Sequence, residues 1–180
     1  GDGLRLWEET YAPFGLVPRP GGSTGVQMGG WFRKRIERLA DLRGLKVRMP
    51  GLGGRVLARA GATAMVVGAS QALAALEQGT LDGVEFVGPH DDLRQGFYRG
   101  ARYYYYPGWQ DLGVTWEFTV NKKAYEALPV DLRRALDAAA LAVGTQVLAE
   151  YEAKNALALR RLRTEFKDRV EIVPFPAPVL

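Results

Sequence analysis

Short apolar blocks alternate along the chain with longer blocks whose apolar residues recur three or four positions apart. The short blocks predict strands and the longer ones predict helices. Because strands separated by helices of about ten residues form βαβ units, the pattern predicts an α/β fold with a mostly parallel sheet. In the first half, the strands are predicted at 15–20, 45–50, 63–68 and 81–89, with helices at 51–61 and 70–79.

The remaining blocks extend this alternation toward both ends of the chain. Polar and glycine residues support the helix ends, with Ser70 and Asn121 as N-caps and Gly79 as a C-terminal stop. The end of a helix is predicted at 3–12, a helical turn region at 31–44, a helix at 91–101, and strands at 103–106, 114–121 and 170–175.

From Pro129 the pattern changes to a sustained helical period. Apolar residues three, four or seven positions apart continue through residues 130–166, namely Leu132, Leu136, Val143, Val147 and Tyr151. This spacing predicts one long amphipathic helix, or two in sequence, near the C-terminus.

Composition and charge narrow the class of protein. Of the 180 residues, 47% are hydrophobic and 24% are charged, which is typical of a globular domain. The net charge of +4 is small, and the basic residues are scattered among acids. No nucleic-acid partner is therefore predicted. No apolar stretch approaches the roughly 18 residues of a membrane span. The chain has no initiator methionine, so a processed or truncated piece of a longer protein is expected.

The side chains that are missing limit the chemistry further. There is no cysteine and only one histidine, His90. Disulfides, thiolate chemistry and the usual zinc clusters are excluded, so any bound metal is expected to be a hard ion held by oxygen atoms. His90, Asp91 and Asp92 allow acid/base chemistry, but no nucleophile motif accompanies them. As the first residues of a helix, the two acids are also favoured by its dipole.

An unusually aromatic segment, ARYYYYPGWQD, occupies residues 101–111. Neighbouring strand side chains point to opposite faces, so both faces of this strand are aromatic. The tyrosines can be core residues with hydroxyls at the rim.

Two charged residues stand inside apolar strands. Arg48 lies between Val47 and Met49, where an unpaired guanidinium is costly. It is either a carboxylate clamp at a strand end or an edge-strand arginine that reaches solvent. Glu85 lies between Val84 and Phe86, near the predicted carboxyl end of a strand, where α/β sheets place ligands. A buried acid there needs a cation or a proton.

Taken in order, several motifs resemble the solute-binding proteins of TRAP transporters. The motifs are GGSTGVQMGGWFRKRI, LKVRMPG, ALEQGTLDGVEFVGPHDD, YYYYPGW and VNKKAYEALP. The Gln-Met-Gly-Gly-Trp-Phe and Tyr-Tyr-Pro-Gly-Trp runs are similar to the branch that binds 2-oxoacids and lactate. The resemblance covers essentially the whole chain.

The resemblance implies a two-lobed fold like that of type II periplasmic binding proteins, here incomplete, because family members have roughly 300 residues. It identifies the chain as a central fragment with residues 1–19 as a remnant of lobe I. Residues 20–86 would belong to lobe II, 87–116 with the tyrosine strand to lobe I, and 117–180 with the long helix to lobe II.

A ligand set is also implied by the resemblance. Arg48 would hold the ligand carboxylate, and Trp109 would reach the ligand. The tyrosine strand would have one face under helices and the other beside the cleft. A sodium or calcium ion shared with the ligand would be held by Gln27, Glu85, the carbonyl of Phe86 and Asp111. Relatives carry Glu and Trp at the positions of Asp111 and Phe86.

The implied function is a periplasmic or otherwise extracytoplasmic receptor, not an enzyme. It would bind a 2-oxo or 2-hydroxy carboxylate and pass it to the membrane permease subunits, with a homodimer as a further partner. The alternative is a metal-dependent enzyme that uses Glu85 and Asp111 on an oxoacid. The lack of a general-base histidine counts against this alternative.

Overall fold

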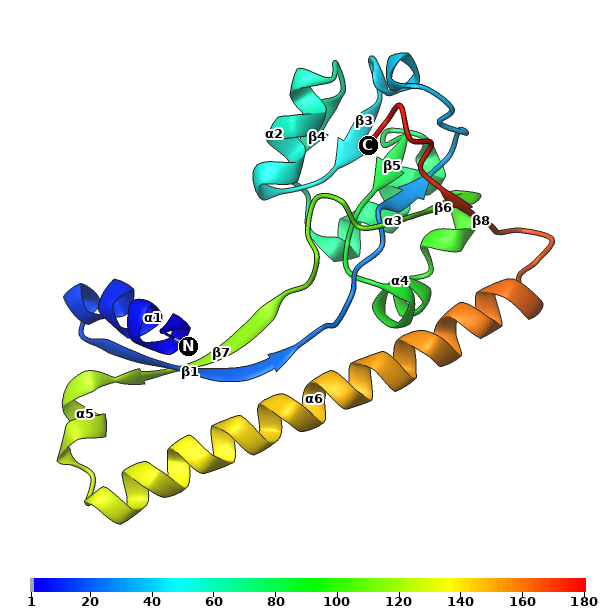
Figure 1. The fold of residues 1–180 in the computed structure, drawn as a ribbon. Helices are drawn as coiled ribbons and strands as arrows, with labels where there is room; N and C mark the ends of the chain where they lie inside the picture. Colours follow the sequence, from blue (N-terminus) through cyan, green and yellow to red (C-terminus); the bar gives the residue numbers. More distant parts are fainter. Residues whose placement is uncertain (1) are drawn as a thin grey trace. The chain divides into compact units, whose positions relative to one another are not determined.

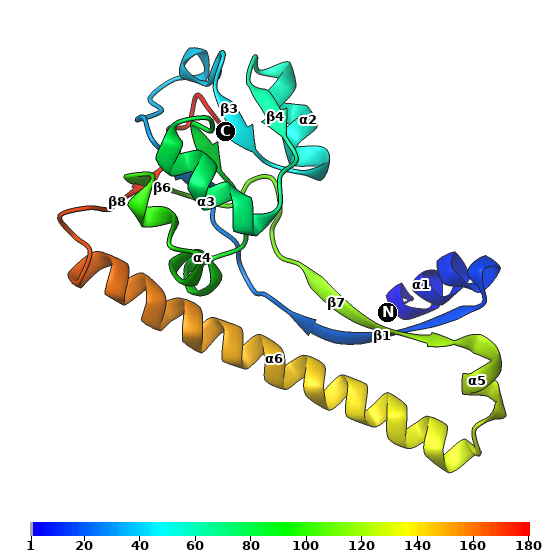
Figure 2. The same cartoon turned by 180° about the vertical axis from the view of Figure 1, so that it is seen from behind.

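The computed structural model describes residues 2–180, which divide into two compact units. Unit 1 combines the N-terminal residues up to Gly25 with Val114–Tyr151, and unit 2 combines Val26–Gly113 with Glu152–Leu180. Figures 1 and 2 show that each unit draws on distant parts of the chain; in unit 2, for example, strand β8 near the C-terminus lies beside strand β6.

This division differs from the predicted one. Residues 20–86 and 87–116 were assigned to different lobes, but most of both segments lies in unit 2. The cause is strand pairing: β2 (Gly30–Phe32) forms an antiparallel ladder with β6 (Tyr103–Tyr106). The tyrosine strand is therefore part of the same sheet as the strands of residues 46–84. Which unit corresponds to which lobe stays a prediction.

Unit 2 contains a six-stranded mixed sheet in the order β4-β3-β5-β2-β6-β8. β3 is parallel to β4 and β5, β2 is antiparallel to both of its neighbours, and β6 is parallel to β8. All strands except β2 therefore run in one direction, which confirms the mostly parallel α/β prediction. The remaining strands are β3 (Lys46–Arg48), β4 (Thr63–Met65), β5 (Gly83–Val84) and β8 (Glu171–Pro174).

The helices of unit 2 agree with the sequence pattern in most places. They are α2 (Gly51–Arg59), α3 (Ala69–Gln78), α4 (Pro89–Gln95) and two 3-10 turns, Leu39–Leu42 and Phe97–Arg99. Gly79 ends α3 in the left-handed conformation, as predicted. The predicted N-cap Ser70 is wrong, because Gly68 holds that position.

The helical prediction for residues 31–44 is also largely wrong. Residues 30–32 form strand β2, and only Leu39–Leu42 makes a short 3-10 turn. Trp31 and Phe32 are almost completely buried, on neighbouring positions of one strand. Burial of two large aromatic rings within the sheet outweighs the weak helical preference of this segment.

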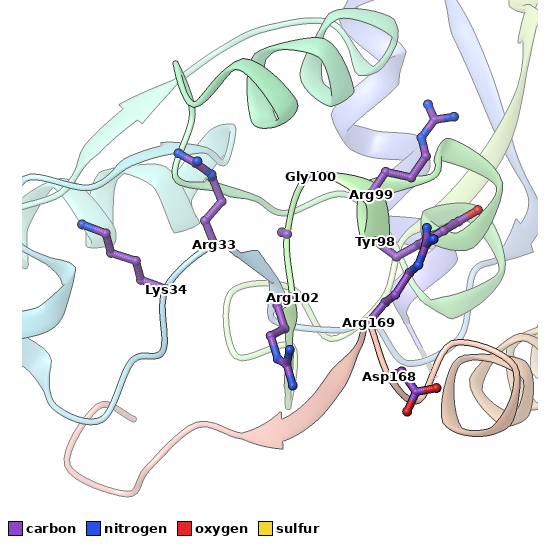
Figure 3. A pocket seen from close by; sticks show the side chains of 9 residues that line it. Arg33, Lys34, Tyr98, Arg99, Gly100, Arg102, Asp168 and Arg169 are labelled. Atoms are coloured by element: carbon purple, nitrogen blue, oxygen red, sulfur yellow. The ribbon is translucent and has the colours of Figure 1, made fainter.

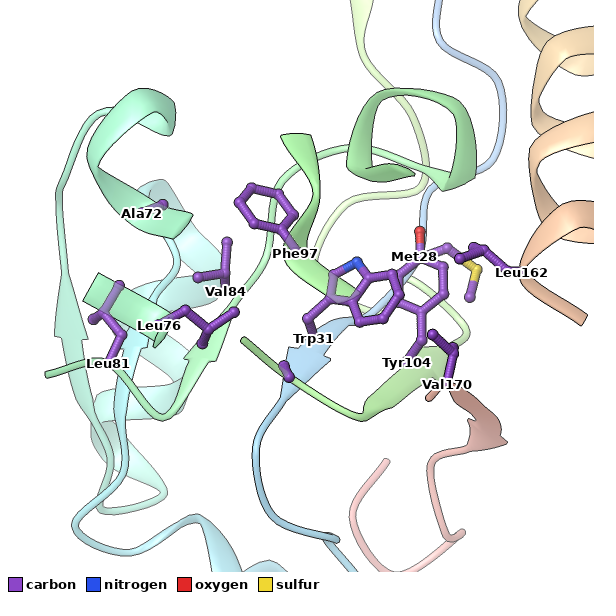
Figure 4. Close-up of a cluster of buried hydrophobic side chains, with 11 residues drawn as sticks. Met28, Trp31, Ala72, Leu76, Leu81, Val84, Phe97, Tyr104, Leu162 and Val170 are labelled. Carbon is purple, nitrogen blue, oxygen red and sulfur yellow. The ribbon is translucent and has the colours of Figure 1, made fainter. Parts of the chain in front are cut away.

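Two hydrophobic clusters form the core of unit 2, and the tyrosine strand joins both. Tyr104 stacks on Trp31 with ring centroids 4.0 Å apart, in the cluster drawn in Figure 4. Tyr105 belongs to the second cluster and stacks on Phe175 at 4.5 Å. Both hydroxyls are bonded inside the protein, to Asp92 and to the backbone of Ile36. The aromatic side chains on the two faces of this strand therefore pack into two different hydrophobic clusters.

Unit 1 is built on a two-stranded antiparallel ribbon, β1 (Leu16–Ser23) with β7 (Thr115–Asn121). It also contains α1 (Gly3–Tyr11), a 3-10 turn (Ala12–Phe14) and α5 (Lys122–Ala127), and Asn121 caps α5 as predicted. Arg19 is its polar centre. This side chain binds Glu8 at 2.6 Å and Asp137 at 2.7 Å, and it donates to the Tyr125 hydroxyl.

The long C-terminal pattern forms one helix, α6 (Val130–Thr164), which settles the choice between one helix and two. The predicted apolar stripe is only partly buried, however. Val147 and Tyr151 are half-buried and pack against Gly22 and Trp116 in unit 1. Leu132, Leu136 and Val143 are 50%, 37% and 39% exposed, whereas Ala158 and Leu162 are buried in unit 2. Across residues 2–180, no helix combines the length and apolar character needed to cross a membrane.

Candidate ligand and metal site

Two of the predicted binding residues, Arg48 and Glu85, lie at one edge of the unit 2 sheet. Arg48 is the last residue of β3, and Glu85 directly follows the neighbouring strand β5. Gly30, the first residue of the antiparallel strand β2, lies at the same edge, because a Cβ on Gly30 would contact Glu85 at 3.3 Å. This edge is the carboxyl end of the parallel strands, where open α/β sheets place their ligands.

The Arg48 guanidinium donates hydrogen bonds from two of its three nitrogens. Its Nε donates to the carbonyl of Val67 at 3.3 Å, and Nη1 donates to the carbonyl of Glu85. Its guanidinium also lies 5.4 Å from the centre of the Phe86 ring. Within residues 2–180, Nη2 donates no hydrogen bond, and 15% of the side chain is exposed. Two contacts therefore orient the guanidinium, and one nitrogen remains available to an anion.

The Glu85 carboxyl is the most strongly perturbed acid at this edge. Its Oε2 is 3.8 Å from Nη1 of Arg48, too long for a hydrogen bond, and the residue is only 5% exposed. Burial raises the pKa of this carboxyl to about 7; the Arg48 charge opposes the rise, and the Asp92 and Asp111 charges add to it. A buried acid in this state favours either a proton or a nearby cation.

Gln110 also lies beside Glu85, although no sequence motif predicts a role for it. Its Nε2 donates to the Met28 carbonyl at 3.0 Å and to Oε1 of Glu85 at 3.4 Å. Within the described part of the chain, its buried Oε1 accepts no hydrogen bond. The only sequence signal was its place between Trp109 and Asp111, two predicted site residues.

The backbone that carries Phe86 is held from both sides. Glu85 N donates to the Arg48 carbonyl at 2.9 Å, and Val87 N donates to Oδ1 of Asp92 at 3.1 Å. Asp92 in turn accepts on Oδ2 from the Trp31 indole and the Tyr104 hydroxyl. Asp92 was predicted as a helix starter, and it does lie in the first turn of α4. Its second role in fixing residues 85–87 depends on tertiary contacts.

The other predicted residues are placed less uniformly. Gln27 is buried, with 2% of its surface exposed, and its backbone carbonyl lies close to Gly108. Asp111 is exposed and accepts from Gly113 N at 3.1 Å, although its charge still acts on Glu85. Trp109 packs against the cluster that contains Phe32, Tyr105 and Phe175. The ligand contact of Trp109 and the metal bond of Asp111 stay predictions.

The donor set at this edge fits a hard cation. The predicted ligands supply only amide, carboxylate and carbonyl oxygens, which sodium and calcium prefer. The buried acceptor on Gln110 adds one more oxygen without a partner, and a cation would offset the buried charge of Glu85. Residues 2–180 contain no group of three His, Cys, Asp or Glu side chains suited to a metal. The proposed set would thus rely on amide and carbonyl oxygens beside its two acids.

These features of the sheet edge indicate the general class of protein. A sheet whose carboxyl edge carries an oriented guanidinium and a buried acid that contacts a buried amide has the architecture of a small-ligand binding protein.

The chain belongs to the DctP family of bacterial extracellular solute-binding proteins, family 7, whose sequence profile matches residues 19–180. This confirms the resemblance found in the sequence. A curated relative, the monocarboxylate 2-oxoacid-binding periplasmic protein of Nostoc sp., is 39% identical over 180 residues. The match includes all of this chain and 49% of the relative.

Solved structures give the same assignment. A TRAP periplasmic solute-binding protein of Pseudoalteromonas atlantica, with bound sodium and pyruvate, is 44% identical with a TM-score of 0.89. One from Colwellia psychrerythraea, with bound calcium and pyruvate, is 40% identical with a TM-score of 0.92. One from Bordetella bronchiseptica is 41% identical with a TM-score of 0.89; it is a mixed-occupancy dimer with calcium and picolinate.

The chain is shorter than these relatives. The matches cover 99% of this chain but 52% to 54% of the three solved chains. The chain thus spans about half of the proteins to which it is similar.

Proposed function

We propose that the protein is the solute-binding component of a TRAP transporter and binds a 2-oxo or 2-hydroxy carboxylate together with a sodium or calcium ion. In this proposal it works in the periplasm, delivers its ligand to the membrane permease subunits, and is two-lobed when whole. The observation that carries the proposal is the placement of Arg48, Glu85 and Gln110 at one sheet edge, in a chain similar to structures that hold pyruvate with either ion.

Each residue has a distinct task in this proposal. Arg48 presents its free nitrogen to the ligand carboxylate, with its direction set by the carbonyls of Val67 and Glu85. Gln27, Glu85, the Phe86 carbonyl and Asp111 would hold the ion, which supplies positive charge that the ligand oxygens share. The buried surroundings strengthen these contacts by excluding water.

Titration calorimetry on the whole encoded protein tests the proposal, with pyruvate, lactate and longer oxoacids, each with and without calcium or sodium. Arg48→Met should weaken pyruvate binding by about a hundredfold, because the ligand carboxylate loses a charge-assisted bond inside a buried site. Arg55→Met is the matched control, since Arg55 is exposed on α2. No binding of any acid with either ion would overturn the proposal.

The enzyme alternative is disfavoured by the family, whose members are solute-binding proteins. Turnover of an oxoacid that is lost on Glu85→Gln would reinstate it. Tight binding without turnover is the expected result. A homodimer, seen in the Bordetella bronchiseptica relative, is tested by light scattering on the same samples.

A further inference from the structure

A second polar surface of unit 2 has no part in the proposed ligand site. It is an open cavity of about 740 Å³, lined by Arg33, Lys34, Tyr98, Arg99, Gly100, Ala101, Arg102, Asp168 and Arg169. These residues follow β2 and precede β6 and β8. They therefore lie at the opposite edge of the sheet from Arg48, Glu85 and Gln110.

The charge of this cavity is strongly one-sided. Five basic side chains and one acidic side chain line it, and this excess of four equals the net charge of +4 of the entire chain. Elsewhere, basic residues such as Arg19, Arg38 and Arg161 have acidic partners. Among residues 2–180, Arg33, Lys34 and Arg169 form no ion pair. The positive charges of the cavity are therefore not fully neutralised by acidic side chains.

Some of these basic side chains contact acidic or backbone groups nearby, which lowers the excess positive charge of the cavity but does not remove it. Arg99 is 3.3 Å from Glu77, Arg102 is 4.0 Å from Glu171, and the Arg33 guanidinium lies over Gly79 at the end of α3. Lys34 and Arg169 are exposed and have no such contact in the described chain. Like charges held together without local partners favour an anionic partner that neutralises them.

We propose that this basic cavity docks an acidic segment of a protein partner. Figure 3 shows the labelled side chains spread along the cavity instead of converging on one point, which suits an extended partner better than a single small anion. Arginine predominates among the cations, and its planar fork matches carboxylates in a bidentate manner. The surface is hollowed, so a protruding loop fits it better than a flat lipid bilayer does.

Binding of a fluorescent glutamate-rich peptide, followed by anisotropy on the whole encoded protein, tests this proposal. The double variant Lys34→Glu/Arg169→Glu should weaken binding by about tenfold or more, and added salt should weaken wild-type binding. The matched control is Lys123→Glu/Arg55→Glu, which makes the same change in net charge at exposed positions outside the cavity. It should change binding by less than about twofold.

Each other outcome overturns the proposal. Equal loss in both double variants means that only net charge matters. Binding to phosphatidylglycerol vesicles but not to the peptide identifies a membrane surface instead, and displacement of the peptide by an equal concentration of inorganic phosphate identifies a small-anion site. Pyruvate affinity, measured in parallel, should be the same in wild type and both variants, which keeps this test separate from that of the ligand site.

Discussion

The two units of the molecule are stabilised in different ways. Both hydrophobic clusters lie entirely in unit 2, whereas unit 1 has no cluster of comparable size among its described residues. Unit 1 instead contains one buried arginine with two acidic partners, Glu8 and Asp137, and it leaves large apolar side chains such as Phe14 and Trp116 exposed. Unit 2, which contains both clusters, also carries the candidate site, as expected where a site must be held in a fixed geometry.

Two tryptophans give the sharpest test of this difference. Trp31 is completely buried in unit 2, and Trp116 is 43% exposed in unit 1. Trp31→Ala should lower the free energy of unfolding by about 3 to 5 kcal/mol, because it leaves a cavity and removes the stacking with Tyr104. Trp116→Ala should cost about 1 kcal/mol. Urea unfolding monitored by circular dichroism measures both, and equal losses would contradict the comparison.

Arg19 tests the polar centre of unit 1. Arg19→Met should lower the free energy of unfolding by about 2 kcal/mol, less than for a fully buried pair because Glu8 and Asp137 are about 40% exposed. The control is Arg161→Met, which breaks an exposed pair between Arg161 on α6 and Glu165 just after this helix and should leave stability unchanged. If Arg19→Met is neutral as well, unit 1 does not depend on this centre.

Asp92 links the core of unit 2 to its candidate site. Asp92→Asn should cost about 1 to 3 kcal/mol, because one amide oxygen cannot accept from Val87, Trp31 and Tyr104 as two carboxyl oxygens do. It should also speed amide exchange at Val87 and weaken pyruvate binding. Tyr105→Phe removes a buried hydroxyl from the other core and is the control. A variant that loses only stability would show that Asp92 does not position residues 85–87.

The pH dependence of stability tests the buried Glu85 carboxyl at the candidate site. The pKa of Glu85 rises from 4.5 to about 7 on folding, mainly through burial. The folded protein therefore retains this proton where the unfolded chain loses it, and the contribution to stability falls as pH increases from about 4.5 to 7. Glu85→Gln should reduce this slope in thermal melts without metal. Calcium binding near pH 6 should release protons, because the ion requires the carboxylate.

The spacing of apolar residues along the sequence was sufficient to predict many of the helices and strands. The sequence pattern predicted α2, α3 and the helical character of residues 130–166, because helical and strand periods are properties of neighbouring residues. It failed at residues 31–44, where aromatic burial in a mixed sheet decides the structure. Only part of the apolar stripe of α6 is covered, namely Val147 and Tyr151, because spacing alone does not determine what packs on a helix.

The sequence by itself also determined the oxygen-donor chemistry of the site, since it offers no cysteine and a single histidine, and it marked Arg48 and Glu85 as charges in apolar strands. Only the tertiary structure decided that Gln110 and Asp92 support that edge, and that Trp109 packs into a core. It also placed the tyrosine strand between two cores in the same unit as the predicted site residues. The physical reason is that strand pairing and burial depend on residues distant in sequence, whereas periodicity and side-chain chemistry are local.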